Sequence, residues 1–244
     1  MNSTDMSDLS VDTDTLPPYV VPHSQEPITI LYEDSDVMVV IKPHLLLSVP
    51  GRHPINRDSL VSRLQRRCPE VKAVHRLDLD TSGIMVVPKH AASLSELARQ
   101  FQRREVDKEY TAIVWGELRD DTGTVELPIA TDWPNRPKQK ICADTGKSAI
   151  THFEVLARHA NSSVVKLRPV TGRSHQLRIH MASLGHPILG CDMYAHEEAL
   201  HGASRLLLHA TRLKFRLPTN LTWFSGFAPI PFSLSQDVLH PQES

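Results

Sequence analysis

The chain has 244 residues, 40% of them hydrophobic, which is enough for one sizeable buried core and predicts a single folded domain. No run approaches the roughly 18 apolar residues that a membrane span requires, and the N-terminal region lacks the basic start and apolar stretch of a secretory signal. Cys68, Cys142 and Cys191 form no CxxC pair, which argues against a disulfide framework or a structural zinc site. These features predict a cytoplasmic protein with reduced thiols.

The charge is unevenly distributed along the chain. The formal net charge is −1, but residues 1–30 contain five acidic side chains and no Lys or Arg, which leaves 27 basic against 23 acidic residues in the remainder. Residues 52–76 alone hold seven Lys or Arg and only two acidic side chains. A basic patch of this kind suits a phosphate backbone, although a solvated arginine-rich face is an equal alternative.

The first third of the chain is predicted to contain a tail, two strands and a helix. Residues 1–26 are rich in Ser, Thr, Asp and Pro and are expected to form a disordered acidic tail. Residues 28–32 and the β-branched run 37–41 are typical of strands separated by a turn. Residues 58–67 predict a helix that places Leu60, Val61 and Leu64 on one face.

Further elements alternate through the rest of the chain. Residues 84–87 predict a buried strand, and Ser93 with Glu96 predicts a capping box for a helix that ends near Arg104. A strand is expected at 110–118, a hairpin from 149–155 and 165–168, and a helix at 174–184 that stops at Gly185. We therefore expect an α+β fold with a mixed, mainly antiparallel sheet flanked by helices, formed by residues 27–218. Residues 219–244 are expected to be irregular chain, partly packed on the body.

The strongest concentration of polar groups is residues 75–83, which read HRLDLDTSG between a basic segment and a buried strand. In an extended chain Arg76 and Asp78 point the same way, while Leu77 and Leu79 point towards apolar packing. Read without any comparison, the segment is more typical of a surface turn in which Asp80, Thr81 and Ser82 satisfy backbone groups.

This segment resembles the HRLDxxTSG signature of the RluA family of pseudouridine synthases. The similarity continues in the family's order through residues 108–110, 132–140, 171–180, 185–190 and 207–210. It covers roughly residues 28–217, and several ordered blocks are not expected by chance. The resemblance implies an isomerase that detaches uracil from a uridine in RNA, turns it and rejoins it through carbon.

The resemblance also assigns candidate catalytic residues. Asp78 matches the family's essential aspartate, which could act as a nucleophile, stabilise charge on the sugar or remove a proton. Tyr110 matches a tyrosine that stacks on the uracil, although a core tyrosine on a strand would look the same. Arg178 matches an arginine that pairs with the catalytic carboxylate, and Arg173 is the alternative.

RNA binding is assigned to six side chains, His75, Arg76, Arg136, Lys138, Lys140 and Arg173. Arg76 suits a wedge that fills the space of the flipped base, because its planar guanidinium can stack on bases, but it could also only extend the basic patch. Residues 132–140 have two prolines among three basic side chains, which predicts a stiff loop able to pinch an RNA hairpin; an ordinary exposed connection is the alternative.

No cofactor or metal is expected. Asp80 is predicted to cap the turn with Thr81 and Ser82 rather than to form a carboxylate pair with Asp78. His175 and His180 are five residues apart and share a face of neither a helix nor a strand, which argues against zinc. Phosphate-binding glycine loops are also missing from the sequence.

The short build and the block 132–140 resemble the family member that accepts both transfer RNA and large-subunit ribosomal RNA. We therefore expect a monomer that modifies the first uridine of the anticodon loop and a similar ribosomal hairpin, without contact to a membrane. The alternatives are the same chemistry on one RNA class or another uridine, and a non-catalytic RNA-binding module. A hydrolase is disfavoured because no nucleophile elbow is present.

Overall fold

The computed structural model describes residues 20–234, so the predicted disorder of residues 1–19 lies outside the described part of the chain. The strands are β1 (Thr29–Glu33), β2 (Val37–Lys42), β3 (Ser82–Pro88), β4 (Asp107–Trp115), β5 (Thr122–Glu126), β6 (Ile129–Thr131), β7 (Gln139–Ile141), β8 (Ile150–His159), β9 (Ser162–Pro169), β10 (Leu208–Arg216) and β11 (Trp223–Phe227). The helices are α1 (Leu60–Gln65), α2 (Ala91–Gln102), α3 (Gln176–Ser183) and α4 (Glu197–His201).

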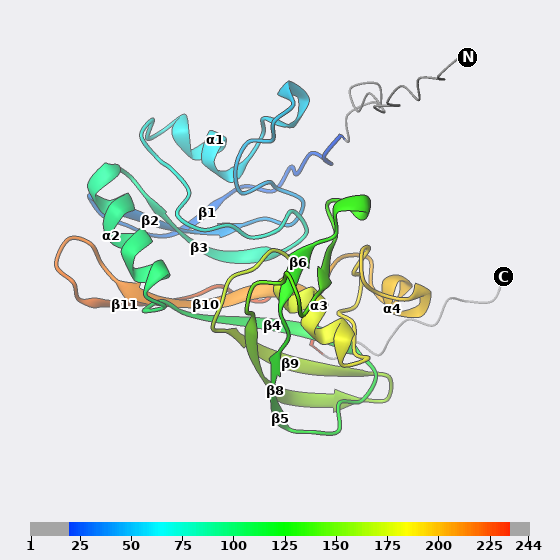
Figure 1. Ribbon diagram of the computed structural model, residues 1–244. Helices are drawn as coiled ribbons and strands as arrows, with labels where there is room; N and C mark the ends of the chain where they lie inside the picture. Colours follow the sequence, from blue (N-terminus) through cyan, green and yellow to red (C-terminus); the bar gives the residue numbers. More distant parts are fainter. Residues whose placement is uncertain (1–19, 235–244) are drawn as a thin grey trace, which may run out of the picture.

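Residues 20–234 contain one nine-stranded sheet in the order β1-β2-β3-β10-β4-β9-β8-β5, with β11 also paired to β10 (Figure 1). Neighbouring strands are antiparallel except β3 and β10, which run parallel. Strands β6 and β7 form a separate two-stranded arm. The α+β fold with a mixed, mainly antiparallel sheet is thus confirmed.

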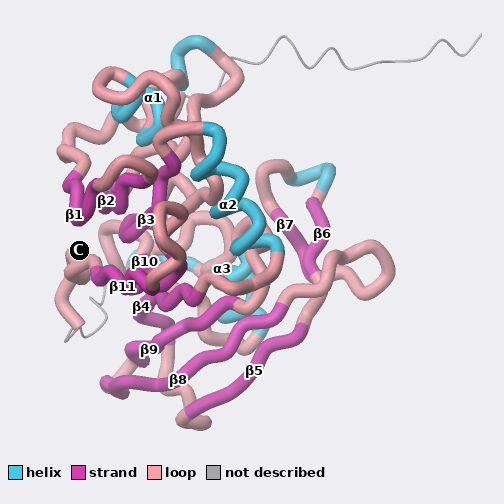
Figure 2. The backbone as a smooth tube through the Cα atoms, turned by 90° about the vertical axis from the view of Figure 1, so that its left-hand side faces the viewer, coloured by secondary structure: helices cyan, strands magenta, loops and turns pink. Residues whose placement is uncertain are grey.

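The hydrophobic core consists of two main clusters, one on each half of this sheet. In the first half the β-branched run 37–40 is fully buried in β2 and packs with β3, α1 and α2. In the second half, side chains of β4 and β9 pack against Leu177 and Met181 of α3. Tyr110 on β4 packs against both halves. Figure 2 shows α2, α3 and the β6–β7 arm on the same side of the sheet.

The start of α2 differs from the prediction. The helix begins at Ala91, and its capping box is formed by His90 and Ser93, with the His90 ring accepting from the Ser93 amide at 3.3 Å. Ser93 therefore occupies the third helical position instead of the cap, and Glu96 pairs with Arg99. The predicted Ser93–Glu96 capping box was wrong. The imidazole nitrogen of His90 accepts a hydrogen bond from a backbone amide of the first turn, as a serine hydroxyl would, so the helix begins earlier than predicted.

Both described ends of the chain are attached to the body. Residues 20–26 have no regular secondary structure, but the Val21 amide donates to Asn56 and the Arg63 guanidinium donates to the carbonyls of Ser24 and Glu26. At the other end, residues 223–227 form strand β11 instead of the expected irregular chain. No helix within residues 20–234 has the length and hydropathy needed to cross a membrane.

Candidate active site

The loop of residues 75–82 is fixed to the body at its odd-numbered positions. The Ser48 hydroxyl donates to the Leu77 carbonyl at 2.7 Å and accepts from the Leu77 amide at 3.0 Å. Two residues later, the Lys42 ammonium donates to the Leu79 carbonyl at 3.1 Å. Leu77 is buried whereas Arg76 is exposed, which agrees with the predicted alternation. The intervening Asp78 is therefore held between two anchored backbone units.

The ends of the same loop are held by histidines. His75 Nε2 accepts from the Val86 amide at 3.1 Å, and its ring stacks on Phe101 with 4.8 Å between centroids. Burial lowers the pKa of His75 to about 3, with a further contribution from Lys108, so the ring is a neutral acceptor. At the other end, Ser82 contacts His209 Nδ1 at 2.8 Å. His75 thus has a structural bond that its RNA-binding assignment did not anticipate.

Lys42 is a buried cation beneath the loop. Its side chain has no exposed surface, and its ammonium donates to the carbonyls of Pro43, Leu46 and Leu79. Burial lowers its pKa to about 7, while the charges of Asp78 and Asp80 raise it. The sequence does not single out this lysine, because a basic residue followed by proline also marks an ordinary strand end.

The residues predicted to carry the chemistry meet in one cleft of about 1200 Å³. Asp78, Tyr110 and Arg178 all line it, and they come from the loop 75–82, β4 and α3 respectively. Four of the predicted RNA-binding side chains also line the cleft, namely His75, Arg76, Arg136 and Arg173. Lys138 and Lys140 do not; they lie exposed on the β6–β7 arm.

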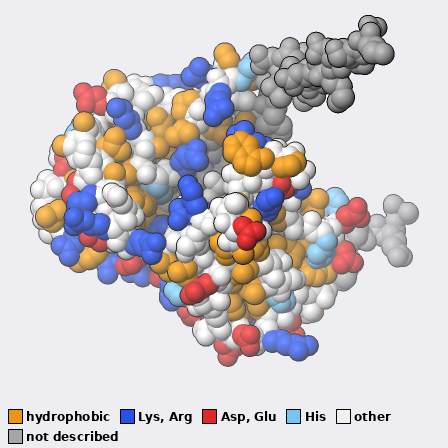
Figure 3. Space-filling model, in the orientation of Figure 1, with side chains coloured by type: hydrophobic (Ala, Val, Ile, Leu, Met, Phe, Trp, Pro, Cys, Tyr) orange, Lys and Arg blue, Asp and Glu red, His pale blue; other side chains and the backbone are white. Residues whose placement is uncertain are grey.

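The lining of this cleft is strongly basic. It includes six Lys or Arg residues and a single acidic one, Asp78. Figure 3 shows Lys and Arg side chains gathered around the middle of the face on which the arm stands. An anionic polymer is therefore attracted to the cleft, and one carboxylate is placed within it.

Tyr110 is fixed at the centre of the sheet. It pairs with Ala210 of β10 on one side and with Leu167 of β9 on the other. Burial raises the pKa of its phenol, and the charge of Asp78 raises it further. The hydroxyl is therefore protonated at neutral pH. The sequence left two alternatives for Tyr110, a core residue or a residue of the site. The structure shows that it packs against the core and also lines the cleft.

Arg178 is placed differently from its prediction. Its side chain is 1% exposed and contacts Cys191 Sγ at 3.2 Å, the Asp192 carboxylate, and Asp80 at 3.7 Å. Burial opposes its charge, but Cys191 and the carboxylates of Asp78 and Asp192 raise its pKa overall. Within residues 20–234 neither Arg178 nor Arg173 forms an ion pair with Asp78, and Arg173 bonds the Ser148 carbonyl instead.

Asp80 also departs from its expected role. Its carboxylate faces Arg178 instead of capping the turn with Thr81 and Ser82, and the turn is closed by the Thr81 amide donating to the Asp78 carbonyl at 3.2 Å. Burial raises the pKa of Asp80, and Arg178 opposes that effect. Both corrections have one cause: Asp80, and not Asp78, lies within ion-pair distance of Arg178, and this contact between distant parts of the chain cannot be read from local sequence.

A hydrogen-bonded chain links the arm to this site. The Gln139 amide on β7 donates to the Tyr194 hydroxyl at 2.9 Å, and that hydroxyl contacts His175 Nδ1 at 2.6 Å. Nothing in the sequence indicates these hydrogen bonds. His180, the other histidine considered for zinc, contacts Thr151 and the Leu127 carbonyl.

The comparisons with known proteins point to one family. Residues 36–183 match the model of the RNA pseudouridylate synthase family. The chain is 56% identical over 185 residues to the dual-specificity RNA pseudouridine synthase RluA of Yersinia pestis, covering 75% of this chain and 90% of that one. It is 51% identical over 210 residues to the protein of the same name from Escherichia coli K12, covering 85% and 96%.

A solved structure has the same fold. Human RNA pseudouridylate synthase domain containing 1 superposes with a TM-score of 0.72 at 29% identity, covering 91% of this chain and 94% of that one. The family model spans more than half of the chain, and the curated relatives match it over most of their own length. The resemblance found in the sequence is thereby confirmed, and the chain belongs to the RNA pseudouridylate synthase family of isomerases.

Proposed function

We propose that the chain converts uridine to pseudouridine in two RNAs: at the first position of the anticodon loop of transfer RNA, and in a similar hairpin of large-subunit ribosomal RNA. The dual-specificity name of the relatives from Yersinia pestis and Escherichia coli supports two substrates. The observation that carries the proposal is the meeting of Asp78, Tyr110 and Arg178, from three separate segments, in one basic cleft.

The reaction breaks the bond from uracil N1 to the ribose and forms a bond from C5 to the same carbon, with loss of the C5 proton. Asp78 is the single carboxylate of the cleft lining and is assigned to the steps that cleave the N1 bond and form the C5 bond, as nucleophile, charge stabiliser or base. Tyr110 stacks on the uracil with its phenol protonated, because burial and Asp78 raise its pKa.

Arg178 serves the site through Asp80 and Asp192. Its buried guanidinium holds Asp80, two residues after Asp78, and so restrains the loop that carries the carboxylate. Its charge also favours the ionised form of a nearby carboxylate. Arg178 is therefore proposed as a positioning residue.

RNA contacts are proposed on both sides of the cleft. Arg76 makes no hydrogen bond or ion pair inside the described chain and is exposed beside Asp78, which suits a wedge that replaces the flipped base. Arg136, Lys138 and Lys140 of the arm, together with Arg173 and His75, contact the surrounding RNA. Monomeric state and action in the cytoplasm, where both RNAs are found, stay predictions.

The test is tritium release from uridine labelled at C5, using an anticodon stem-loop and the matching ribosomal hairpin. Wild type should release tritium from both RNAs, and Asp78→Asn should lose at least about 1000-fold in rate while keeping its melting temperature and RNA affinity. Release from one RNA alone would restrict the substrate range. Binding without release from either would favour the non-catalytic RNA-binding module.

A further inference from the structure

Helices α2 and α3 end in the same backbone motif with different residues at its critical position. After α3, the Gly185 amide donates to the Ala182 carbonyl at 3.0 Å and the His186 amide to the Met181 carbonyl at 3.1 Å, with Gly185 at φ 80°. This is the Schellman arrangement, in which a left-handed residue closes the helix and glycine is favoured because it has no Cβ.

After α2, arginine occupies that position. The Arg104 amide donates to the Phe101 carbonyl at 3.2 Å, the Glu105 amide donates to the Gln100 carbonyl at 2.9 Å, and Arg104 has φ 59°. A side chain with a Cβ is strained there, and such strain persists in proteins where function requires it. Arginine thus occupies a position at which glycine would form the turn with less strain.

The Arg104 side chain gains nothing inside the protein that would offset this strain. It is exposed, and within residues 20–234 it makes no hydrogen bond, ion pair or contact with an aromatic ring. His175, another left-handed residue of the cleft lining, differs because its ring bonds the Tyr194 hydroxyl at 2.6 Å. The guanidinium of Arg104 is therefore available to a ligand.

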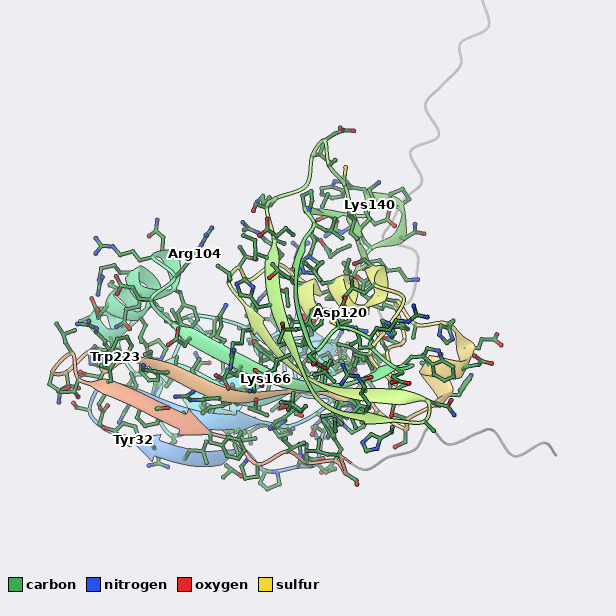
Figure 4. The ribbon with its side chains drawn as sticks, turned by 90° about the horizontal axis from the view of Figure 1, so that it is seen from below. Tyr32, Arg104, Asp120, Lys140, Lys166 and Trp223 are labelled. Atoms are coloured by element: carbon green, nitrogen blue, oxygen red, sulfur yellow. The ribbon has the colours of Figure 1, made fainter. Side chains whose placement is uncertain are left out.

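The position of Arg104 defines that ligand. Arg104 lines the cleft beside Gln102 and Phe101, whereas Arg103 does not. Figure 4 shows Arg104 at the end of α2 and Lys140 on the β6–β7 arm, standing on the same side of the sheet. The arm's Arg136 and Gln139 line the cleft as well, so α2 and the arm form two of its borders. A cation at each border matches an RNA hairpin, whose two strands carry phosphates on both flanks.

We propose that Arg104 binds a backbone phosphate of the RNA strand that lies on the α2 side of the cleft, opposite the arm, and that this contact accounts for an arginine at a position that favours glycine. The inference rests on the proposed function in that it takes a structured RNA as the substrate. It adds a binding residue that lies outside the family's sequence blocks and outside the predicted RNA-binding set.

The experiment compares Arg104→Gly, Arg104→Ala, Arg104→Lys and the matched neighbour Arg103→Ala. The dissociation constant of the anticodon stem-loop is measured by fluorescence anisotropy at several salt concentrations, each variant also carrying Asp78→Asn so that no turnover occurs. Melting temperatures are measured in parallel. Single-turnover tritium release is measured for the same four substitutions with Asp78 intact.

Arg104→Gly and Arg104→Ala should weaken binding by about 3- to 10-fold and reduce the slope of log affinity against log salt by about 1. Arg104→Lys should keep the slope, and Arg103→Ala should resemble wild type. Arg104→Gly should keep its melting temperature or raise it by about 2 °C, because glycine relieves the left-handed strain. A destabilised turn therefore cannot explain its weaker binding.

A salt slope for Arg104→Gly equal to that of wild type would overturn the proposal, as would an equal loss in Arg103→Ala. Either result, obtained while wild type releases tritium, leaves the isomerase function intact and removes only the Arg104 contact. Absence of release by wild type is instead the failure of the proposed function.

Discussion

The loop 75–82 and the β6–β7 arm border the same cleft but are held in opposite ways. The loop is bonded at His75, Leu77, Leu79 and Ser82 by groups from four other segments. The arm is bonded at its base to Lys147, and towards α3 through the Gln139 amide and Tyr194, while Trp133 near its tip is 71% exposed. The carboxylate proposed to cleave the glycosidic bond is thus carried by a firmly anchored loop, whereas the arm proposed to contact RNA has an exposed tip.

Removal of one anchor of the loop should have the largest effect after loss of Asp78 itself. Ser48→Ala removes both hydrogen bonds to Leu77 and leaves a buried amide and carbonyl unpaired. We expect kcat to fall by about 100-fold with KM nearly unchanged, because a small displacement of a reacting group has an effect of this order. Steady-state tritium release measures both constants.

The control for this anchor is Ser95→Ala, which removes an exposed hydroxyl that bonds the Ala91 carbonyl on the outside of α2. It should leave both constants at wild-type values. If the loss in Ser48→Ala merely follows the folded fraction, with kcat per folded molecule unchanged, Ser48 stabilises the fold without positioning Asp78.

The attachment of the arm should affect substrate binding more than chemistry. Tyr194→Phe deletes the hydroxyl that joins the Gln139 amide to His175 but keeps the ring, over which the Arg178 guanidinium lies at 5.6 Å. We expect KM to rise by about tenfold, the value of one hydrogen bond, with kcat changing less. Tyr32→Phe, whose hydroxyl bonds Asp34 away from the cleft, is the matched control. A fall in kcat with KM unchanged would mean that Tyr194 acts on the chemical step, as the loop anchors do, and not on RNA binding.

The last effect concerns stability in acid and not catalysis. The pKa of His75 is about 3 in the folded protein because of burial, and about 6.5 in the unfolded chain. As the pH falls below 6.5 the unfolded chain binds the proton first, so stability is complete above pH 6.5 and is lost towards pH 3, by at most about 1.4 kcal/mol per pH unit.

His75→Gln tests this dependence, since its side-chain oxygen can accept from the Val86 amide near the position of Nε2 without titrating. Urea unfolding at pH 6.5 and 4.5 should show a smaller loss of stability in the variant than in wild type. Equal losses would mean that other groups, such as His44 and His209, whose pKa values burial lowers to about 4, account for the acid sensitivity.

The sequence predicted most elements because their signals are local. The run 37–41 reads as a buried strand from its β-branched residues, and the hairpin of β8 and β9 from alternation on both sides of a turn. The start of α2 was predicted wrongly, and strands β5, β6, β7, β10 and β11 and helix α4 were not predicted. A histidine cap is an uncommon signal, and β11 depends on pairing with β10, since Trp223 and Phe227 on their own resemble surface chain.

By itself the sequence determined the fold class, the family and the three side chains that meet in the cleft, because each depends on a pattern carried by contiguous residues. Only the tertiary structure decided that Arg178 holds Asp80 and Asp192, that Lys42 lies buried beneath the loop, and that Tyr194 connects the arm to His175. Those partners are separated along the chain, and their distances are set by how α3 and the segments after β2 and Gly190 pack around the loop.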